Sequence, residues 1–410
     1  MKRLKTFCML LLILTGALFW SFDGAWGNER QWLVLVYANG INDRGLQDFG
    51  KDMINRLETF GSSDQVTVVV KYAALSKGNQ GELQFPRDVK TYLIQKDTRQ
   101  PEINSPVIDT SPQTDMAAAS SLMTFIRQNL VKYPAKKIAL ILWGKGEGFK
   151  GLCHDDLSRK KMSVRDLAQS LAKTKDILGR KIDVFAVDAD YMQMAEVLYE
   201  LKDQTQIIVG VESHVSNPAF YYDIILQDVL DDPNMSAEDF AKTMIAFSEN
   251  PIASAVRTSE VRIFTDLLNQ WAAALVSEPA AMKAALAAAE TTFSFNMKEA
   301  KDLCDYIDQI ATRLSADSPA AVMGAKLKNH IQKNLLLTSA VSNFDPQTKK
   351  ISPQPTQAHC HGLAIYLPDL IYESGAYEPL SFAADTSWRN FLLKLLDEKL
   401  KQKILPPGGK

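Results

Sequence analysis

Apolar runs that alternate with helical patterns constrain the fold of this chain more than any other feature. The clearest runs are WLVLVYA at Trp32 to Ala38, KIALILW at Lys137 to Trp143 and IDVFAV at Ile182 to Val187. Near-continuous runs of this kind are typical of strands that are covered on both faces. Between them lie stretches whose apolar residues share one helical face. Repeated strand-helix-strand units predict an α/β fold with a mainly parallel sheet between helices, and sites in the loops at the carboxyl ends of its strands.

The second half of the chain has a different pattern. After about residue 230 the sequence is mostly helical, with an alanine-rich stretch at Ala280 to Phe293 and a closing helix around Trp388 to Leu400. One late apolar run, Gly362 to Pro368, reads as a strand that returns to the same sheet. We therefore expect an α/β core over residues 28–230 and a mostly helical portion over 231–410 that packs on this core.

Residues 1–27 have the layout of a secretory signal peptide. Basic residues open the N-terminus, an apolar run extends from Phe7 to Trp20, and Ala25 and Gly27 form a small-x-small cleavage site. An uncleaved anchor helix is the alternative, although the run is short for a membrane span. No later segment is long and apolar enough to cross a bilayer. The sequence predicts an exported protein, periplasmic or secreted, that has no membrane contact after cleavage.

Charge and cysteine content exclude two further classes. The net charge is −2 and the basic residues are scattered, so the chain lacks the basic stripe that a nucleic-acid partner requires. Three cysteines follow the signal peptide, at Cys153, Cys304 and Cys360. They allow one disulfide with a free thiol, or three buried thiols, and they are too few to form a disulfide scaffold.

A resemblance to a known family lies at the ends of the predicted strands. The stretches WLVLVYANGINDRGLQDFGKDMINRLE, YPAKKIALILWGKGEGF and IDVFAVDADYMQMAEVLYEL, with HGLAIYLP and YEPLSFAADTSWRNFL, resemble the clostripain family in the family's order. Members of that family are caspase-fold cysteine peptidases that cut after basic residues. The resemblance implies a caspase-like α/β/α sandwich with a mainly parallel central sheet, whose helical C-terminal portion returns a strand to the sheet.

The residues that carry the family's chemistry are replaced. By this resemblance the catalytic histidine falls on Lys145 and the nucleophilic cysteine on Asp190. Lysine, with an ordinary pKa of about 10.4, is almost fully protonated at pH 7 and is a poor general base. A carboxylate is a poor nucleophile toward amides. We therefore expect an inactive homologue, a pseudopeptidase with a cleft that binds a peptide or protein ligand.

The opposite charges of the two replacements suggest one hypothesis about the cleft. Lys145 and Asp190 could form an ion pair where the catalytic residues stand in the family, and a partly buried pair would fix the geometry of the cleft. Two independent, solvated substitutions are the equally weighted alternative.

Three neighbouring residues are candidates for ligand binding. Asp188 matches the family's acidic residue that receives the basic side chain of the substrate, which would retain binding of Arg or Lys without cleavage. The alternative is an aspartate that caps the following helix. Gly144 and Gly146 flank Lys145 and could present backbone N–H donors, or serve only the turn.

An active enzyme with a relocated nucleophile is the competing function. Cys153 and His154 lie in the loop after Lys145 and could reach the cleft, although adjacent residues on an extended chain point in opposite directions. His214, beyond the run Gln206 to Val211, is expected near the edge of the site as polar surface.

No metal or cofactor is predicted. His359 and His361 share one face of an extended segment, but two ligands are a weak signal for a metal site. The family's dependence on calcium finds no acidic cluster here, because Asp43 and Asp48 alone do not make a site.

Overall fold

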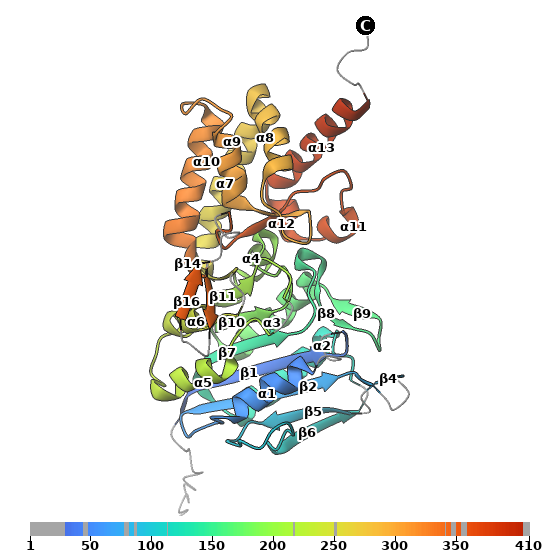
Figure 1. Cartoon of the computed structure of the whole chain (residues 1–410), viewed down its shortest axis with the longest axis vertical. Coiled ribbons are helices and arrows are strands. Elements are labelled where there is room, and N and C mark those ends of the chain that lie inside the picture. Colours follow the sequence, from blue (N-terminus) through green and yellow to red (C-terminus); the bar gives the residue numbers. More distant parts are fainter. Residues whose placement is uncertain are drawn as a thin grey trace, which may run out of the picture.

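The computed structural model describes residues 29–43, 48–77, 82–85, 88–112, 114–215, 218–249, 252–340, 342–345, 350–353 and 359–404. The predicted signal peptide, residues 1–27, lies outside the described residues. Figure 1 shows a large sheet with helices on both faces and a group of later helices at one end of the molecule.

In the described part of the chain, the large sheet has nine strands in the order β14-β12-β11-β10-β7-β1-β2-β5-β6. The five central strands pair in parallel, and the pairs toward both edges are antiparallel. Their bounds are β1 Arg30–Gly40, β2 Val66–Ala74, β5 Asp88–Leu93, β6 Val107–Pro112, β7 Ala135–Trp143, β10 Ile182–Asp188, β11 Thr205–Val211, β12 Ala253–Arg257 and β14 Leu336–Ser339. The predicted α/β fold with a mainly parallel sheet is confirmed.

Among the residues that the structure describes, four short two-stranded sheets lie outside the main one. They are β3 Ser76–Lys77 with β4 Leu83–Gln84, β8 Leu152–Asp155 with β9 Lys160–Met162, β13 Ala300–Asp302 with β17 Ala364–Tyr366, and β15 Ser342–Asp345 with β16 Lys350–Pro353.

Helices cover the sheet on both faces, which is why the central strands are apolar throughout. In β1, Leu33 and Leu35 belong to one core, and Val34 and Val36 belong to the other. Helices α1, α5 and α6 pack on the second core, and α2, α3 and α4 on the first. Alternate side chains of one strand therefore enter separate cores, so that both must be apolar.

The α-helices are α1 Phe49–Glu58, α2 Ala119–Lys132, α3 Val164–Leu178, α4 Ala195–Leu201, α5 Tyr222–Asp231, α6 Ala237–Ala246, α7 Val261–Ser277, α8 Pro279–Thr291, α9 Leu303–Ala311, α10 Pro319–His330, α11 Ser374–Tyr377, α12 Ser381–Asp385 and α13 Trp388–Ile404. Helix α3 begins as expected for a capping sequence, because the Ser163 hydroxyl accepts a hydrogen bond from the Asp166 N–H at 3.0 Å.

The second half of the chain does return strands to the sheet, but the expected segment is not one of them. β12 and β14 extend the sheet beyond β11, whereas β17 pairs antiparallel with β13 in a separate two-stranded sheet. The expectation that residues 362–368 join the main sheet is wrong in this respect. β12 and β14 extend the sheet at this edge, and β17 pairs with β13 and makes a bridge, Ala364 to Met194, in the segment after β10.

Candidate functional site

The loops that follow β7 and β10 meet at the carboxyl edge of the sheet. Gly148 N–H donates to the Asp190 carbonyl at 3.4 Å, and Gly144 N–H donates to the Asp188 carbonyl at 3.2 Å. A Cβ atom on Gly146 would lie 2.6 Å from the Asp190 carbonyl oxygen, which leaves no room for a side chain. Glycine is therefore required here by the close approach of two backbones.

Lys145 points toward the loop after β1. Its Nζ lies 3.4 Å from Asp43 Oδ2, and the two side chains are 40% and 62% exposed. Exposed pairs of this kind contribute little to stability. The lysine is thus a solvated charge at the rim of the site.

Asp190 is buried and belongs to a different network. Its Oδ1 accepts the Val215 N–H at 2.6 Å and lies 3.0 Å from His214 Nδ1. The His214 side chain is 52% exposed. The hypothesis of a Lys145–Asp190 ion pair is wrong: Asp190 faces the loop after β11 while Lys145 extends to Asp43 on the other side. The Asp190 carboxylate anchors that loop and orients an exposed imidazole.

Asp188 is fully buried at the end of β10. Its Oδ2 accepts hydrogen bonds from the Ala219 N–H at 3.0 Å and from the Tyr222 hydroxyl at 2.9 Å. Tyr222 begins α5, so Asp188 holds the segment that leads into α5 and does not cap α4, the helix that follows it in sequence. The binding role expected for Asp188 stays a prediction, and the geometry gives its carboxylate a structural task.

Gly144 and Gly146, which flank Lys145, make backbone contacts that hold the loop after β7. The N–H of Gly144 is used by the Asp188 carbonyl, and Gly146 bridges to Leu152 in the following hairpin. The role of these glycines in ligand binding stays a prediction, while their contacts account for the turn.

Cys153 does not have the environment of a nucleophile. It is 1% exposed and has a positive φ of 53°. Burial, with the nearby charge of Asp155, raises the pKa of the Cys153 thiol to about 12. A reactive cysteine needs an accessible thiolate, and this thiol is neutral and enclosed.

His154 faces away from the neighbouring thiol. Its Nε2 lies 3.5 Å from Glu147 Oε1 on the preceding turn, and burial lowers the pKa of the imidazole. The two rescue candidates, Cys153 and His154, are therefore held in separate surroundings and do not form a dyad.

Asn39 is a site residue that the sequence reasoning missed. It is fully buried at the end of β1, and its side-chain Nδ2 donates to the carbonyls of Cys153 and His154 at 3.0 Å each. A buried amide of this kind satisfies backbone groups that a loop would otherwise leave unpaired. The signal in the sequence was a polar residue directly after an apolar strand.

The sequence as a whole matches a known family. The family model that describes the clostripain family matches residues 36–395, nearly the whole described chain. The chain belongs to the clostripain family. Clostripain-family membership confirms the resemblance, while the placement of Lys145 and Asp190 at the catalytic positions stays a prediction. A search among curated proteins finds no match.

Solved structures of clostripain-type proteases share the fold. A secreted C11 cysteine protease from Bacteroides thetaiotaomicron in complex with an irreversible peptide inhibitor is similar at a TM-score of 0.61 with 15% identity, over 88% of this chain and 99% of that chain. An inactive zymogen C11 protease from Parabacteroides distasonis is similar at a TM-score of 0.60 with 17% identity, over 87% of this chain and 98% of that chain. At such identities the likeness establishes the caspase-like fold alone.

The calcium dependence of the clostripain family finds no support in the described residues. Within them, no group of three or more His, Cys, Asp or Glu side chains is arranged to hold a metal ion. Asp43 lies beside Lys145, and Asp48 occupies the position before α1 in a left-handed conformation. These two aspartates do not fit a calcium site, because calcium takes about six to eight oxygen ligands and Asp43 is paired with a lysine.

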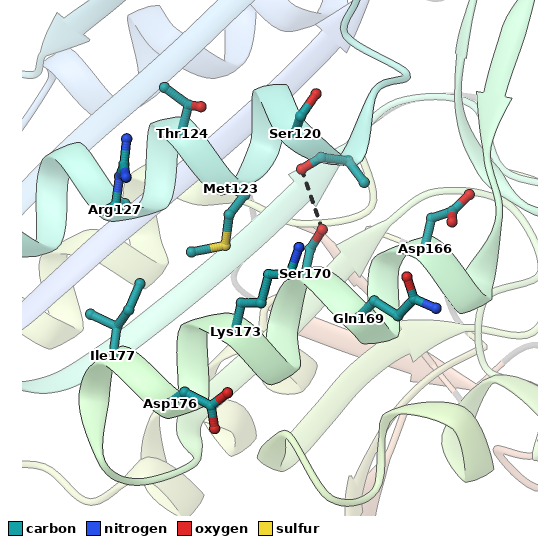
Figure 2. A pocket seen from close by; sticks show the side chains of 11 residues that line it. Ser120, Met123, Thr124, Arg127, Asp166, Gln169, Ser170, Lys173, Asp176 and Ile177 are labelled. Atoms are coloured by element: carbon teal, nitrogen blue, oxygen red, sulfur yellow. Dashed lines mark hydrogen bonds between the residues drawn. The ribbon is translucent and has the colours of Figure 1, made fainter.

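A separate groove of about 520 Å³ lies between α2 and α3, away from the loops that define the clostripain-family site. Figure 2 shows Met123 and Arg127 from α2 facing Lys173 and Ile177 from α3 across it, with the Ser170 hydroxyl donating to the Ala119 carbonyl at 3.3 Å. Charges of both signs line the groove, so it does not select one kind of ligand.

A membrane span requires a helix of sufficient length and apolar content. Among the described helices, none is by itself long and apolar enough to cross a bilayer, and one bent pair, Thr258–Ser277 with Pro279–Thr291, meets that test only when its two members are joined.

Proposed function

We propose that this clostripain-family chain is an exported pseudopeptidase, which lacks cysteine-peptidase activity and uses the family's cleft to bind a peptide or protein ligand. The observation that carries the proposal is the surroundings of Lys145 and Asp190. The lysine is a solvated charge paired with Asp43, and the aspartate is buried and bonded to Val215 and His214. Neither group is placed to attack a carbonyl or to move a proton at neutral pH.

The cysteines support the same proposal. Cys153, Cys304 and Cys360 are all buried, at 1%, 0% and 6% exposure. Burial raises the pKa of each thiol, so that the thiolate is scarce at neutral pH. The competing function, a peptidase that uses Cys153, would need this side chain to leave the core.

The ligand proposal rests on the exposed groups at the rim. The side chains of Lys145, Asp43 and His214 are between 40% and 62% exposed, and they lie in the loops after β7, β1 and β11 of the central sheet. Exposed side chains of opposite charge at the ends of the strands suit a peptide that itself carries both positive and negative charges. Since Asp188 is buried, Asp43 is the exposed carboxylate at the rim that would receive a basic side chain.

Activity is tested with fluorogenic peptides that carry Arg or Lys before the scissile bond. The natural protein is expected to be silent, and the Asp190→Cys, Lys145→His double variant is the comparison that restores the family's residue types. Cleavage by the natural protein that Cys153→Ala abolishes would contradict the proposal. Cleavage that Cys153→Ala leaves intact would also contradict it and would point to a different nucleophile.

Binding is tested separately by fluorescence anisotropy with the same peptides lacking a scissile reporter. We expect binding that the Asp43→Ala, Lys145→Ala double variant weakens. The Arg127→Ala variant, which changes the α2–α3 groove, is the matched control and should bind as the natural protein does. If no charged peptide binds, the proposal that the protein binds a peptide ligand is wrong, and only the proposal that it lacks peptidase activity remains.

A further inference from the structure

The segment that carries β17 is attached to the core by a row of alternate backbone amides. Three N–H groups in residues 362–366 point toward the carboxyl ends of β10 and β11, and their acceptors come from the core. The pairs are Gly362 N–H to Glu212 Oε2 at 2.8 Å, Ala364 N–H to the Gln193 carbonyl at 3.0 Å, and Tyr366 N–H to Glu196 Oε1 at 3.0 Å. Two of the three acceptors are glutamate side chains, so the attachment depends on groups that can change charge.

Glu196 is buried in the first turn of α4 with one oxygen unsatisfied. It is 0% exposed; Oε1 also lies 3.5 Å from the Tyr377 hydroxyl, and Oε2 has no hydrogen-bond partner. The titratable groups that face it are the phenols of Tyr366 on β17 and Tyr377 on α11. Neither is a cation, so a negative charge on buried Glu196 would be offset only by neutral donors such as the Tyr366 N–H and the Tyr377 hydroxyl. Burial raises the pKa of Glu196 to about 7.

Glu212 has a similar environment at the end of β11. It is 0% exposed, and no donor binds its Oε1. It faces the carboxyl group of Asp302, and burial followed by this negative charge raises the pKa of Glu212 well above its ordinary value. A protonated Glu212 can donate to Asp302, whereas an ionised Glu212 would repel it.

The remaining groups near Glu212 do not neutralise it. Asp302 is already bound by His361, whose N–H donates to Oδ2 at 2.6 Å and whose Nδ1 lies 2.9 Å from Oδ1. The thiols of Cys304 on α9 and Cys360 before β17 are the other titratable groups that face Glu212. Lys328 and Asp308 are paired with each other and act on His361 and Cys304. The imidazole of His361 is already bound to Asp302, so an ionised Glu212 would stand as a second carboxylate beside Asp302.

We propose that Glu196 and Glu212 form a protonation-dependent latch, which holds the two-stranded β13–β17 sheet against the ends of β10 and β11 and loosens as the pH rises. This inference stands apart from the proposed function, because it does not depend on whether a peptide binds or is cut. Glu212 lies two residues before His214, and Glu196 lies six residues after Asp190. The latch therefore connects the C-terminal helical portion to both loops of the candidate site.

The direction of the pH effect follows from the raised pKa values. The folded protein keeps a proton on each glutamate at pH values where the unfolded chain has released it. For Glu196 the stabilising contribution is constant below the ordinary pKa of 4.5, decreases as the pH rises above it, and is lost above about 7. For Glu212 the decrease continues to higher pH. His361 acts in the same direction: burial lowers its pKa but Asp302 outweighs burial, so the raised pKa gives a stabilisation that is lost as the pH rises.

Hydrogen exchange of the attached amides tests the latch directly. In the purified full chain, protection factors of Gly362 and Tyr366, corrected for intrinsic exchange, should fall at least about tenfold between pH 5 and pH 8. In the Glu196→Gln, Glu212→Gln double variant the fall should be clearly smaller, because glutamine keeps the acceptor oxygen and cannot ionise, and only the His361 contribution still changes with pH. The matched control is Glu200→Gln, since Glu200 lies on the same helix and accepts the N–H of Phe382 outside the latch. It should keep the pH dependence of the natural protein.

The proposal does not depend on the variants alone. If protection of Gly362 and Tyr366 in the natural protein does not change between pH 5 and pH 8, the latch does not exist, whether or not the double variant folds. It is equally overturned if the double variant folds and loses protection with pH as steeply as the natural protein. Amides of Ile207 to Val209 in β11 serve as the internal reference, and an equal loss there would indicate global unfolding instead of a latch.

Discussion

At the residue scale, Asp190 stands where the family resemblance places a cysteine, and it has become a structural anchor. Its carboxylate accepts a backbone N–H at 2.6 Å and lies 3.0 Å from an imidazole, in a buried position. Lys145 is exposed and has only a surface partner. The two replacements therefore differ in kind, since one is built into the core and the other is solvated.

This difference predicts unequal costs of substitution. Asp190→Ala leaves the buried Val215 N–H without an acceptor and should lower the free energy of unfolding by about 1–3 kcal/mol. The matched change Asp43→Ala removes only the exposed partner of Lys145 and should cost less than about 0.5 kcal/mol. Urea denaturation of both variants measures the two values. Equal small effects would show that Asp190 does not anchor the loop after β11.

The glycine between the two loops gives a second test. Gly146→Ala places a Cβ 2.6 Å from the Asp190 carbonyl oxygen and 2.9 Å from the Asp190 nitrogen. Both are backbone atoms, so the new Cβ can be accommodated only if the backbone shifts. We expect a loss of about 1–3 kcal/mol from overpacking. Gly375→Ala is the control, because a Cβ there meets nothing within 4 Å, and it should be close to neutral. Thermal melts of the two variants would refute the contact if they coincided.

At the scale of elements, a buried tryptophan at the start of the closing helix α13 attaches this helix to its neighbours. Trp388 begins α13, is 0% exposed, and stacks on Trp271 of α7 with ring centroids 5.9 Å apart. Its Nε1 donates to the Tyr366 carbonyl at 3.1 Å, which links α13 to β17. Tyr366 of β17 is therefore held by α13 through its carbonyl and by Glu196 through its N–H.

Removal of this anchor should have a large effect. Trp388→Ala should destabilise the protein by about 3–5 kcal/mol, because it opens a cavity between α7 and α13 and leaves the Tyr366 carbonyl without its donor. Leu400→Ala on the same helix changes a side chain that is 46% exposed and should cost less than about 0.5 kcal/mol. Guanidinium denaturation compares them, and a small loss for Trp388→Ala would mean that α13 is held by other contacts.

At the scale of the whole molecule, the helical portion and the α/β core share one framework. β12 and β14 come from the second half of the chain and form one edge of the sheet, and β17 is bound by residues of β11 and α4. Figure 1 shows α7 to α10 and α13 beyond that edge of the sheet. The helical portion completes the core instead of standing beside it.

A truncated chain should therefore not fold. Residues 28–230 alone would expose the edge of β11 and the apolar faces that α7 to α10 cover, so we expect an aggregating or molten product. Near-ultraviolet circular dichroism and dye binding measure this, with the chain from residue 28 to 410 as control. A cooperative thermal transition of the fragment would show that the core is an independent domain.

The sequence by itself determined the α/β class and the order of the central elements, because continuous apolar runs and capping residues are local signals, and its resemblance to the clostripain family identified the family. Runs such as Trp32 to Ala38 follow from burial on both faces, and Ser163 caps α3 through a contact three residues away. The tertiary structure alone decided the partners of charged groups. Lys145 contacts Asp43 and Asp190 contacts His214, and β17 pairs with the distant β13 instead of a strand of the main sheet. Contacts between residues distant in the chain depend on the direction of each side chain and on which edge is free, and neither is written in local periodicity.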